Sequence, residues 1–131
     1  MNNRSHKLPQ AIVLSCIDFR FHEKLKRELK KEKINSFDLL CLAGGAKNLA
    51  NPSKKIYQQT VIDNIKLAQK LHKIKTVVLC NHIDCGAYGG SVKFKSPNEE
   101  TKFHQRELKK AGNIVKKLFP DLKIKTFTLE K

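Results

Sequence analysis

Two short segments, far apart in the sequence, carry side chains that can bind a metal ion. The first, "CIDFR", holds Cys16, Asp18 and Arg20 at every second position. The second, "HIDC", holds His82 and Cys85 three positions apart, so one turn can direct both to the same point. Zinc prefers thiolate and imidazole ligands in a tetrahedral arrangement, and two cysteines with one histidine leave its fourth position open for chemistry. The pattern therefore predicts a catalytic zinc site formed by Cys16, His82 and Cys85.

The polar residues beside these three are interpreted from their local pattern. Side chains of an extended chain alternate between two sides, so Asp18 and Arg20 are expected on the same side as Cys16. Asp84 lies between the two residues of the second segment. We expect Asp84 to be a turn residue that binds backbone or orients the neighbouring histidine, rather than a fourth ligand.

The four cysteines fall into two pairs. Cys41 and Cys80 lie within apolar runs and are predicted to be buried core thiols. The N-terminal segment has no apolar stretch of the kind that marks a signal peptide, so we expect a cytoplasmic protein without disulfides. Metal binding is then the better interpretation of Cys16 and Cys85, which have polar neighbours.

The spacing of apolar residues predicts strands that alternate with helices. Short apolar runs predict strands at residues 11–15, 37–42, 74–80 and 122–130. Apolar residues at every third or fourth position predict helices at residues 21–33, from 52 to about 71, and at 99–118. We expect Asn51 to cap the second helix, with Pro52 as its first residue. This order predicts one α/β domain, residues 1–131, in which helices cover both faces of a mainly parallel sheet of about four strands.

The predicted strands bring the polar segments together. Ligands of parallel α/β sheets bind beyond the carboxyl ends of the strands. Residues 16–20 follow the first strand, Gly44 and Gly45 follow the second, and residues 82–85 follow the third. We therefore expect these three loops to meet at one edge of the sheet, with the first and third strands side by side.

The chain is strongly basic, since 27 Lys and Arg against 12 Asp and Glu give a net charge of +15. The lysines are spread over the outer faces of the predicted helices, without an arginine-rich tract or interleaved aromatic residues. This distribution favours a solvated surface that attracts small anions over a nucleic-acid-binding function. No apolar run approaches the roughly 20 residues that a membrane span needs.

The two polar segments resemble the Cys-x-Asp-x-Arg and His-x-x-Cys motifs of the β-class carbonic anhydrases. Between them, "LAGGAKN" is similar to the Asn-Ala-Gly-Asn segment of that family. The order, spacing and predicted elements agree from about residue 11 to residue 90, and residues 122–130 match the family's last strand. On these motifs the chain is identified as a short member of the family, with a β-carbonic-anhydrase-like fold.

This resemblance implies a zinc lyase that converts CO₂ reversibly to bicarbonate. Cys16, His82 and Cys85 would hold Zn²⁺, and a zinc-bound hydroxide would attack CO₂. Asp18 and Arg20 would form the family's dyad. In that dyad, Asp18 accepts a hydrogen bond from the bound water, and Arg20 keeps Asp18 ionised and away from the metal.

The segment around the glycines departs from the family's pattern. Backbone N–H groups at Gly44 and Gly45 are predicted to hold a substrate oxygen, since glycine permits close approach. Leu42 and Gly45 stand where the family motif has asparagines, and Gln10 is the candidate for the family's active-site glutamine. The resemblance also implies a homodimer or higher homo-oligomer, which we expect to be altered because the family's N-terminal helical arm is absent or minimal.

Two other interpretations remain open. The same site could hydrolyse COS or CS₂, as relatives with this fold do, and the shape of the pocket decides between these substrates. A different class is a non-catalytic module that binds zinc, or binds an anion through its basic surface. Full zinc occupancy without hydratase activity would favour that second class.

Overall fold

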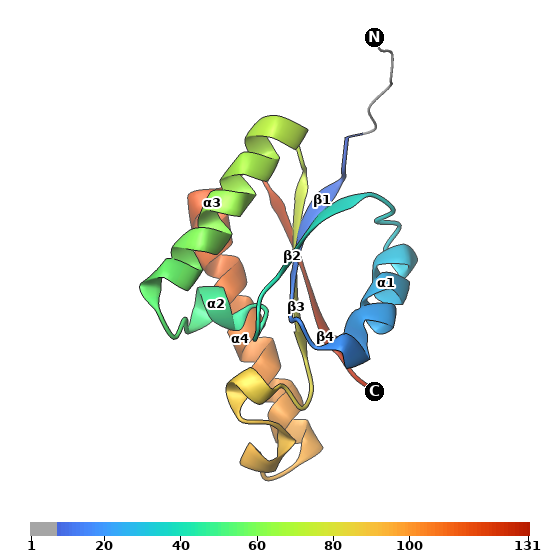
Figure 1. Cartoon of the computed structure of the whole chain (residues 1–131), viewed down its shortest axis with the longest axis vertical. Helices are drawn as coiled ribbons and strands as arrows, with labels where there is room; N and C mark the ends of the chain where they lie inside the picture. The colour runs from blue at the N-terminus through green and yellow to red at the C-terminus, as the bar shows by residue number, and fades with distance from the viewer. Residues whose placement is uncertain (1–7) are drawn as a thin grey trace.

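The computed structural model describes residues 8–131, which form a parallel sheet covered by helices (Figure 1). The strands are β1 (Ala11–Ser15), β2 (Phe37–Cys41), β3 (Thr76–His82) and β4 (Lys123–Leu129). The α-helices are α1 (His22–Lys31), α2 (Lys47–Ala50), α3 (Lys55–His72) and α4 (Pro97–Leu118). Three 3₁₀ turns complete this part of the chain: η1 (Phe19–Phe21), η2 (Gly86–Tyr88) and η3 (Ser91–Lys93). None of the helices in residues 8–131 combines the length and apolar character needed to cross a membrane.

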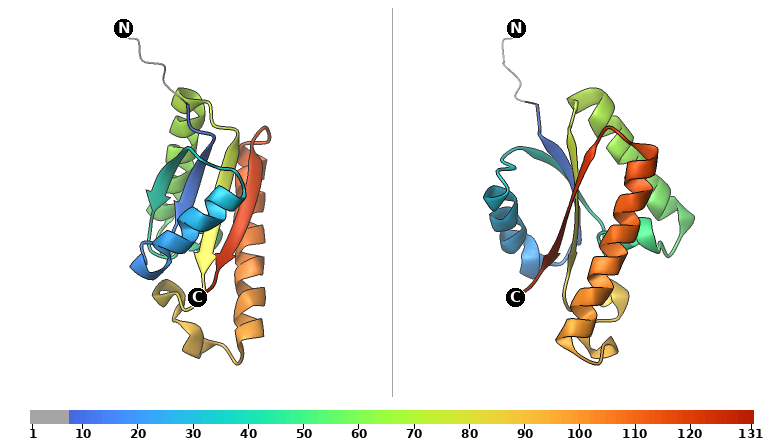
Figure 2. Two further views of the ribbon diagram at one scale, coloured as in Figure 1. Left: turned by 90° about the vertical axis from the view of Figure 1, so that its right-hand side faces the viewer. Right: turned by 180° about the vertical axis from the view of Figure 1, so that it is seen from behind.

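The helices lie in two layers, as predicted. Helix α1 covers one face of the sheet, and α2, α3 and α4 cover the other (Figures 1 and 2). Side chains of β1 alternate between these layers: Ala11 and Val13 pack in the core that includes α1, whereas Ile12 and Leu14 pack in the core of α2, α3 and α4. Because both faces of the sheet are covered, the two strands at its centre each contain a continuous apolar run.

The strand order, β2-β1-β3-β4, places the first and third strands side by side. All three pairings are parallel, and β1 pairs with β3 from Ala11 opposite Thr76 to Leu14 opposite Leu79. Strand β3 runs two residues further than expected, to His82, because β4 continues to pair with it as far as Leu129. The carboxyl ends of β1 and β3 therefore reach the same edge of the sheet, as the sequence predicts.

The predicted start of the second long helix is wrong. Residues 47–50 form the short helix α2, and α3 begins only at Lys55. Asn51, the expected cap, instead donates its side-chain amide to Glu107 of α4 over 2.6 Å. The side chain that was expected to cap α3 therefore links the loop before α3 to α4.

Gly45 lies in the turn after β2, at a point where the chain passes close against β3. Its φ angle is +53°, and a Cβ atom at this position would lie 2.3 Å from the carbonyl oxygen of Cys80. That carbonyl belongs to a central strand and cannot move aside without disturbing its neighbours. Only glycine therefore satisfies both the backbone angle and the available space.

We expect Gly45→Ala to lower the free energy of unfolding by about 2–4 kcal/mol, because it combines backbone strain with a steric clash. Urea unfolding followed by circular dichroism measures the effect. Gly86→Ala is the matched control, since a Cβ atom at Gly86 meets no heavy atom within 4 Å. Equal losses of stability in the two variants would contradict this account of Gly45.

Candidate metal centre

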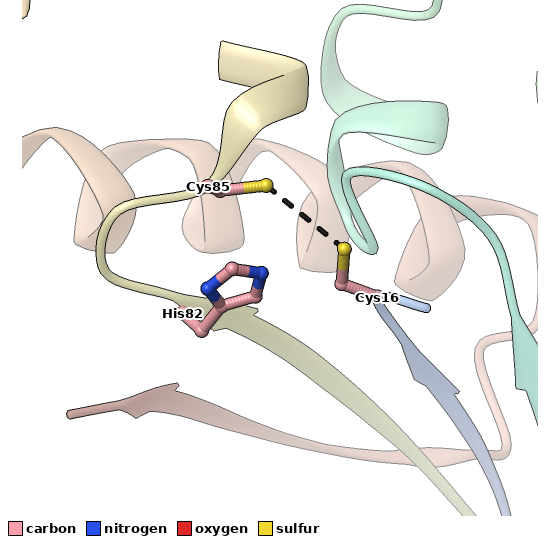
Figure 3. A group of neighbouring side chains, drawn as sticks. All are labelled: Cys16, His82 and Cys85. Carbon is pink, nitrogen blue, oxygen red and sulfur yellow. Dashed lines mark hydrogen bonds between the residues drawn. The ribbon is translucent and has the colours of Figure 1, made fainter. Parts of the chain in front are cut away.

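The three predicted ligands meet at the carboxyl edge of the sheet, where their side chains point toward one another (Figure 3). Cys16 directly follows β1, His82 is the last residue of β3, and Cys85 precedes η2. Their ligand atoms all lie within 4.8 Å of one another, and the two sulfur atoms are 4.0 Å apart. All three side chains are buried. Two thiol sulfurs and one imidazole nitrogen at this spacing can hold a metal ion.

The orientation of His82 suits a metal ligand. Its Nδ1 lies 2.6 Å from the carbonyl oxygen of Ile83, and because a carbonyl only accepts, Nδ1 carries the proton. The imidazole ring stacks on Phe21 with 4.3 Å between ring centroids. Its Nε2 atom is buried and has no hydrogen-bond partner among residues 8–131. A buried polar atom without a partner costs about 1–3 kcal/mol, and a metal ion at this position would satisfy it.

The electrostatics of the three side chains favour a cation between them. A hydrogen bond from Cys85, together with the N–H of Gly44 at 3.3 Å, holds the pKa of Cys16 well below its usual value. The same pairing with Cys16 raises the pKa of Cys85. Burial opposes protonation of His82, but its contacts with Cys16, the backbone of Ile83 and Asp18 raise its pKa overall. A thiolate beside an imidazole that attracts a proton is also a site that attracts a metal ion.

Asp18 and Arg20 form an ion pair at the rim of the site. The Nε and Nη2 atoms of Arg20 donate to the carboxylate of Asp18, with distances of 3.1 and 2.7 Å to Oδ1 and Oδ2. Hydrogen bonds from Arg20 lower the pKa of Asp18 to about 2, so this carboxylate is ionised at neutral pH. Its Oδ2 lies 3.8 Å from Nε2 of His82. An ionised carboxylate therefore faces the point where the ligand atoms meet.

Alternation along an extended chain is the wrong explanation for this pair. Strand β1 ends at Ser15, and Asp18 is the N-cap of η1, where its Oδ1 accepts from the backbone N–H of Arg20 over 3.0 Å. The capping turn, and not a strand, brings the carboxylate to the guanidinium.

Asp84 lies outside the group of metal-ligand candidates and is a turn residue with a φ of +54°. Its Oδ1 accepts from the N–H of Ser91 over 2.9 Å, as expected for a residue that binds backbone. Its Oδ2 accepts from Nη1 of Arg20 over 3.1 Å. Of the two roles expected for Asp84, the structure thus shows the binding of backbone, whereas the carbonyl of Ile83 orients His82.

The remaining predicted positions have varied outcomes. The N–H of Gly44 binds the sulfur of Cys16, and the N–H of Gly45 donates to Leu42 over 2.9 Å, so their role in holding a substrate stays a prediction. Gln10 is misplaced as an active-site residue. It precedes β1, at the opposite end of that strand from Cys16, and binds the backbone of the loop between α1 and β2.

Of the two cysteines assigned to the core, Cys80 is buried as predicted, whereas Cys41 is half-buried. Cys41 lies at the end of β2, an edge strand, so one side of that strand has no neighbour to cover it. Neither residue belongs to the group of metal-ligand candidates.

A buried polar network behind the site was not predicted. Tyr88 packs against Cys16 and Cys85, and its hydroxyl donates to Glu107 of α4 over 2.9 Å. Asn81 of β3 lies within hydrogen-bond distance of Tyr88 and His104. Glu100, His104 and Glu107 lie on the buried face of α4, and this face packs against Asn81 and Tyr88. The side chain of His104 is fully buried. The spacing of residues 100, 104, 107 and 111 on the inner face of α4 is the signal that could have revealed them.

Comparison with known proteins agrees with this geometry. Residues 7–130 match the sequence model of a family described as "Putative carbonic anhydrase". The chain belongs to this family. An uncharacterized protein of Rickettsia conorii is 36% identical over 125 residues, which cover 91% of this chain and 66% of that protein. An uncharacterized protein of Rickettsia bellii is 34% identical over 125 residues, covering 91% of this chain and 75% of that one.

The chain thus spans slightly less than two thirds of the Rickettsia conorii relative. Among solved structures, the carbonic anhydrase from Glaciozyma antarctica superposes with a TM-score of 0.60, over 93% of this chain and 76% of that one. The two sequences are 12% identical, so the likeness shows a shared fold. The predicted β-carbonic-anhydrase-like α/β fold is confirmed.

We expect Cys85→Ser to lower the amount of bound metal from one equivalent to a small fraction of it. The variant should also be less stable, because a metal at this site links the ends of β1 and β3. Metal content by mass spectrometry and thermal unfolding, with and without a chelator, measure the two effects. Cys41→Ser, outside the site, is the control that should keep its metal. Full metal content in Cys85→Ser would remove this residue from the ligand set.

Proposed function

We propose that the protein catalyses the reversible hydration of CO₂ to bicarbonate with Zn²⁺ held by Cys16, His82 and Cys85. The observation that carries this proposal is the placement of Asp18, an ionised carboxylate whose Oδ2 is 3.8 Å from Nε2 of His82, an atom without a hydrogen-bond partner in the described part of the chain. Membership of the carbonic anhydrase family supports it. Zinc is the metal that a donor set of two sulfurs and one nitrogen suits best.

Zinc bound at this site would act as a Lewis acid that lowers the pKa of a water molecule. Two thiolates and a neutral imidazole cancel the charge of the ion, so a further group is needed to position that water. Asp18 can accept a hydrogen bond from the water and orient it toward CO₂. Arg20, through its bonds to both oxygens of Asp18, keeps this carboxylate ionised and directed.

The surroundings of the site suit a small apolar substrate. A cavity of about 480 Å³ opens beside Cys16 and Asp18. Its other lining residues are largely apolar: Ile17, Phe19, Arg20, Ala43, Gly86 and Ala87. An apolar wall beside one carboxylate accommodates CO₂ with little loss of hydration.

The homodimer implied by the resemblance stays a prediction, which the molar mass in solution tests.

Asp18→Asn is expected to keep its zinc and to lower the turnover of CO₂ hydration about 100-fold, because a neutral amide accepts a hydrogen bond from the water more weakly than a carboxylate does. Stopped-flow measurement with a pH indicator, on protein of known zinc content, gives the rate. Asp38→Asn is the control, because Asp38 is paired with His72 and lies outside the site. Unchanged turnover in Asp18→Asn would remove this residue from the mechanism.

For the wild-type protein, we expect the rate of CO₂ hydration to rise with pH through a single ionisation, as for a water nucleophile that loses one proton. A rate of CO₂ hydration that equals the uncatalysed rate in buffer at every pH, on protein with full zinc, would contradict the proposed activity. Hydrolysis of COS or CS₂ would then be assayed at the same site. Inactivity toward all three substrates would favour the non-catalytic zinc module.

A further inference from the structure

Arg20 is held by two carboxylates from different parts of the chain. Its Nε and Nη2 bind Asp18, and its Nη1 donates to Oδ2 of Asp84 over 3.1 Å. Nη2 also donates to the backbone carbonyl oxygen of Asp84 over 3.0 Å. The contacts with Asp84 connect η1 to the loop that carries the second half of the metal site.

Asp84 is itself fixed by a buried carboxylate of α4. Glu100 is 4% exposed, and its Oε2 accepts from the backbone N–H of Asp84 over 2.7 Å. Its Oε1 accepts from the hydroxyl of Ser91 over 2.8 Å, and the N–H of Ser91 donates to Oδ1 of Asp84. Glu100 therefore binds both Asp84 and Ser91, which are also hydrogen-bonded to each other.

The conformation of Asp84 explains why such support is needed. Its φ of +54° lies in the left-handed region. For residues other than glycine this conformation raises the free energy of the folded state, unless local hydrogen bonds offset the strain. In this conformation the side chain and the carbonyl of Asp84 both face Arg20. The bond from Asp84 to Glu100 stabilises the one arrangement that presents two acceptors to the guanidinium.

An ion pair with a half-exposed arginine is weak by itself, since solvent screens it and the long side chain rotates. The guanidinium has five donors in a rigid plane, so acceptors on two sides restrict its rotation more than one carboxylate does. Without the carboxylate and the backbone carbonyl of Asp84 as acceptors, the guanidinium of Arg20 would be bonded only to Asp18.

We propose that Glu100 and Asp84 are positioning residues for Arg20, and that through Arg20 they set the place of the Asp18 carboxylate beside the metal site. The proposal deepens, and rests on, the proposed hydration of CO₂ for its catalytic consequence. Its structural part, the immobilisation of Arg20, holds for the protein with or without a metal.

The test compares Glu100→Gln and Asp84→Asn with Glu107→Gln. Glu107 is the matched control, because it is another buried glutamate of α4, and its side chain binds Tyr88 and Asn51 where that of Glu100 binds Asp84 and Ser91. The first readout is the ¹⁵N relaxation of the Arg20 Nε–H group. It is measured on metal-free and on zinc-loaded protein, with Arg20→Lys to assign the signal among four arginines. The second is kcat for CO₂ hydration.

We expect the order parameter of the Arg20 Nε–H to fall in Glu100→Gln and Asp84→Asn toward that of the exposed Arg27, and kcat to fall about tenfold. Glu107→Gln should lose similar stability while the order parameter of the Arg20 Nε–H stays at the wild-type value. Asp84→Asn covers the case in which Glu100→Gln does not fold, because asparagine tolerates a positive φ and keeps the backbone bond to Glu100.

An Arg20 signal that is as rigid in both variants as in the wild type would overturn the proposal. A mobile Arg20 with unchanged kcat would overturn its catalytic part. The same loss of Arg20 rigidity in Glu107→Gln would show a general effect of burying an amide in α4, which also overturns it. A wild-type protein that does not hydrate CO₂ would refute the proposed function alone, since the mobility of Arg20 is measured independently.

Discussion

The parallel pairing of β1 with β3 is the constraint on which the site depends. These strands are adjacent although residues 16–75 lie between them in the chain, and their register places Leu14 opposite Leu79. Cys16 directly follows β1 and His82 is the last residue of β3, so both side chains lie at the same edge of the sheet. Register is well determined here because helices bury both faces, and a slip of one residue would send each side chain to the opposite face.

The metal-ligand candidates also join the two layers of the molecule. His82 stacks on Phe21 in the layer of α1, whereas Cys16 packs with Tyr88, whose hydroxyl binds α4. A metal held between them would connect structure on both sides of the sheet. Binding would therefore stabilise the association of the layers as well as the loops, which relates metal affinity directly to folding.

The charges at the site differ from those of the chain as a whole. In a protein of net charge +15, the carboxylates of Asp18 and Asp84 both bind Arg20, and the carboxylate of Glu100 holds the backbone of Asp84. The net charge describes the solvated lysines of the surface, while the pairing of these few groups at the site decides the chemistry.

The sequence by itself determined the alternating α/β order and the three ligand candidates, because periodicity and donor chemistry are properties of short segments. The pairing of Asp18 with Arg20 was expected as well, but through the resemblance and not through the capping turn that produces it. Only the tertiary structure decided that Asn51 binds Glu107 instead of capping α3, and that Glu100 holds the turn at Asp84. Each of these contacts joins side chains from separate elements. Their partners depend on how helices pack on the sheet, and no local pattern of residues records that packing.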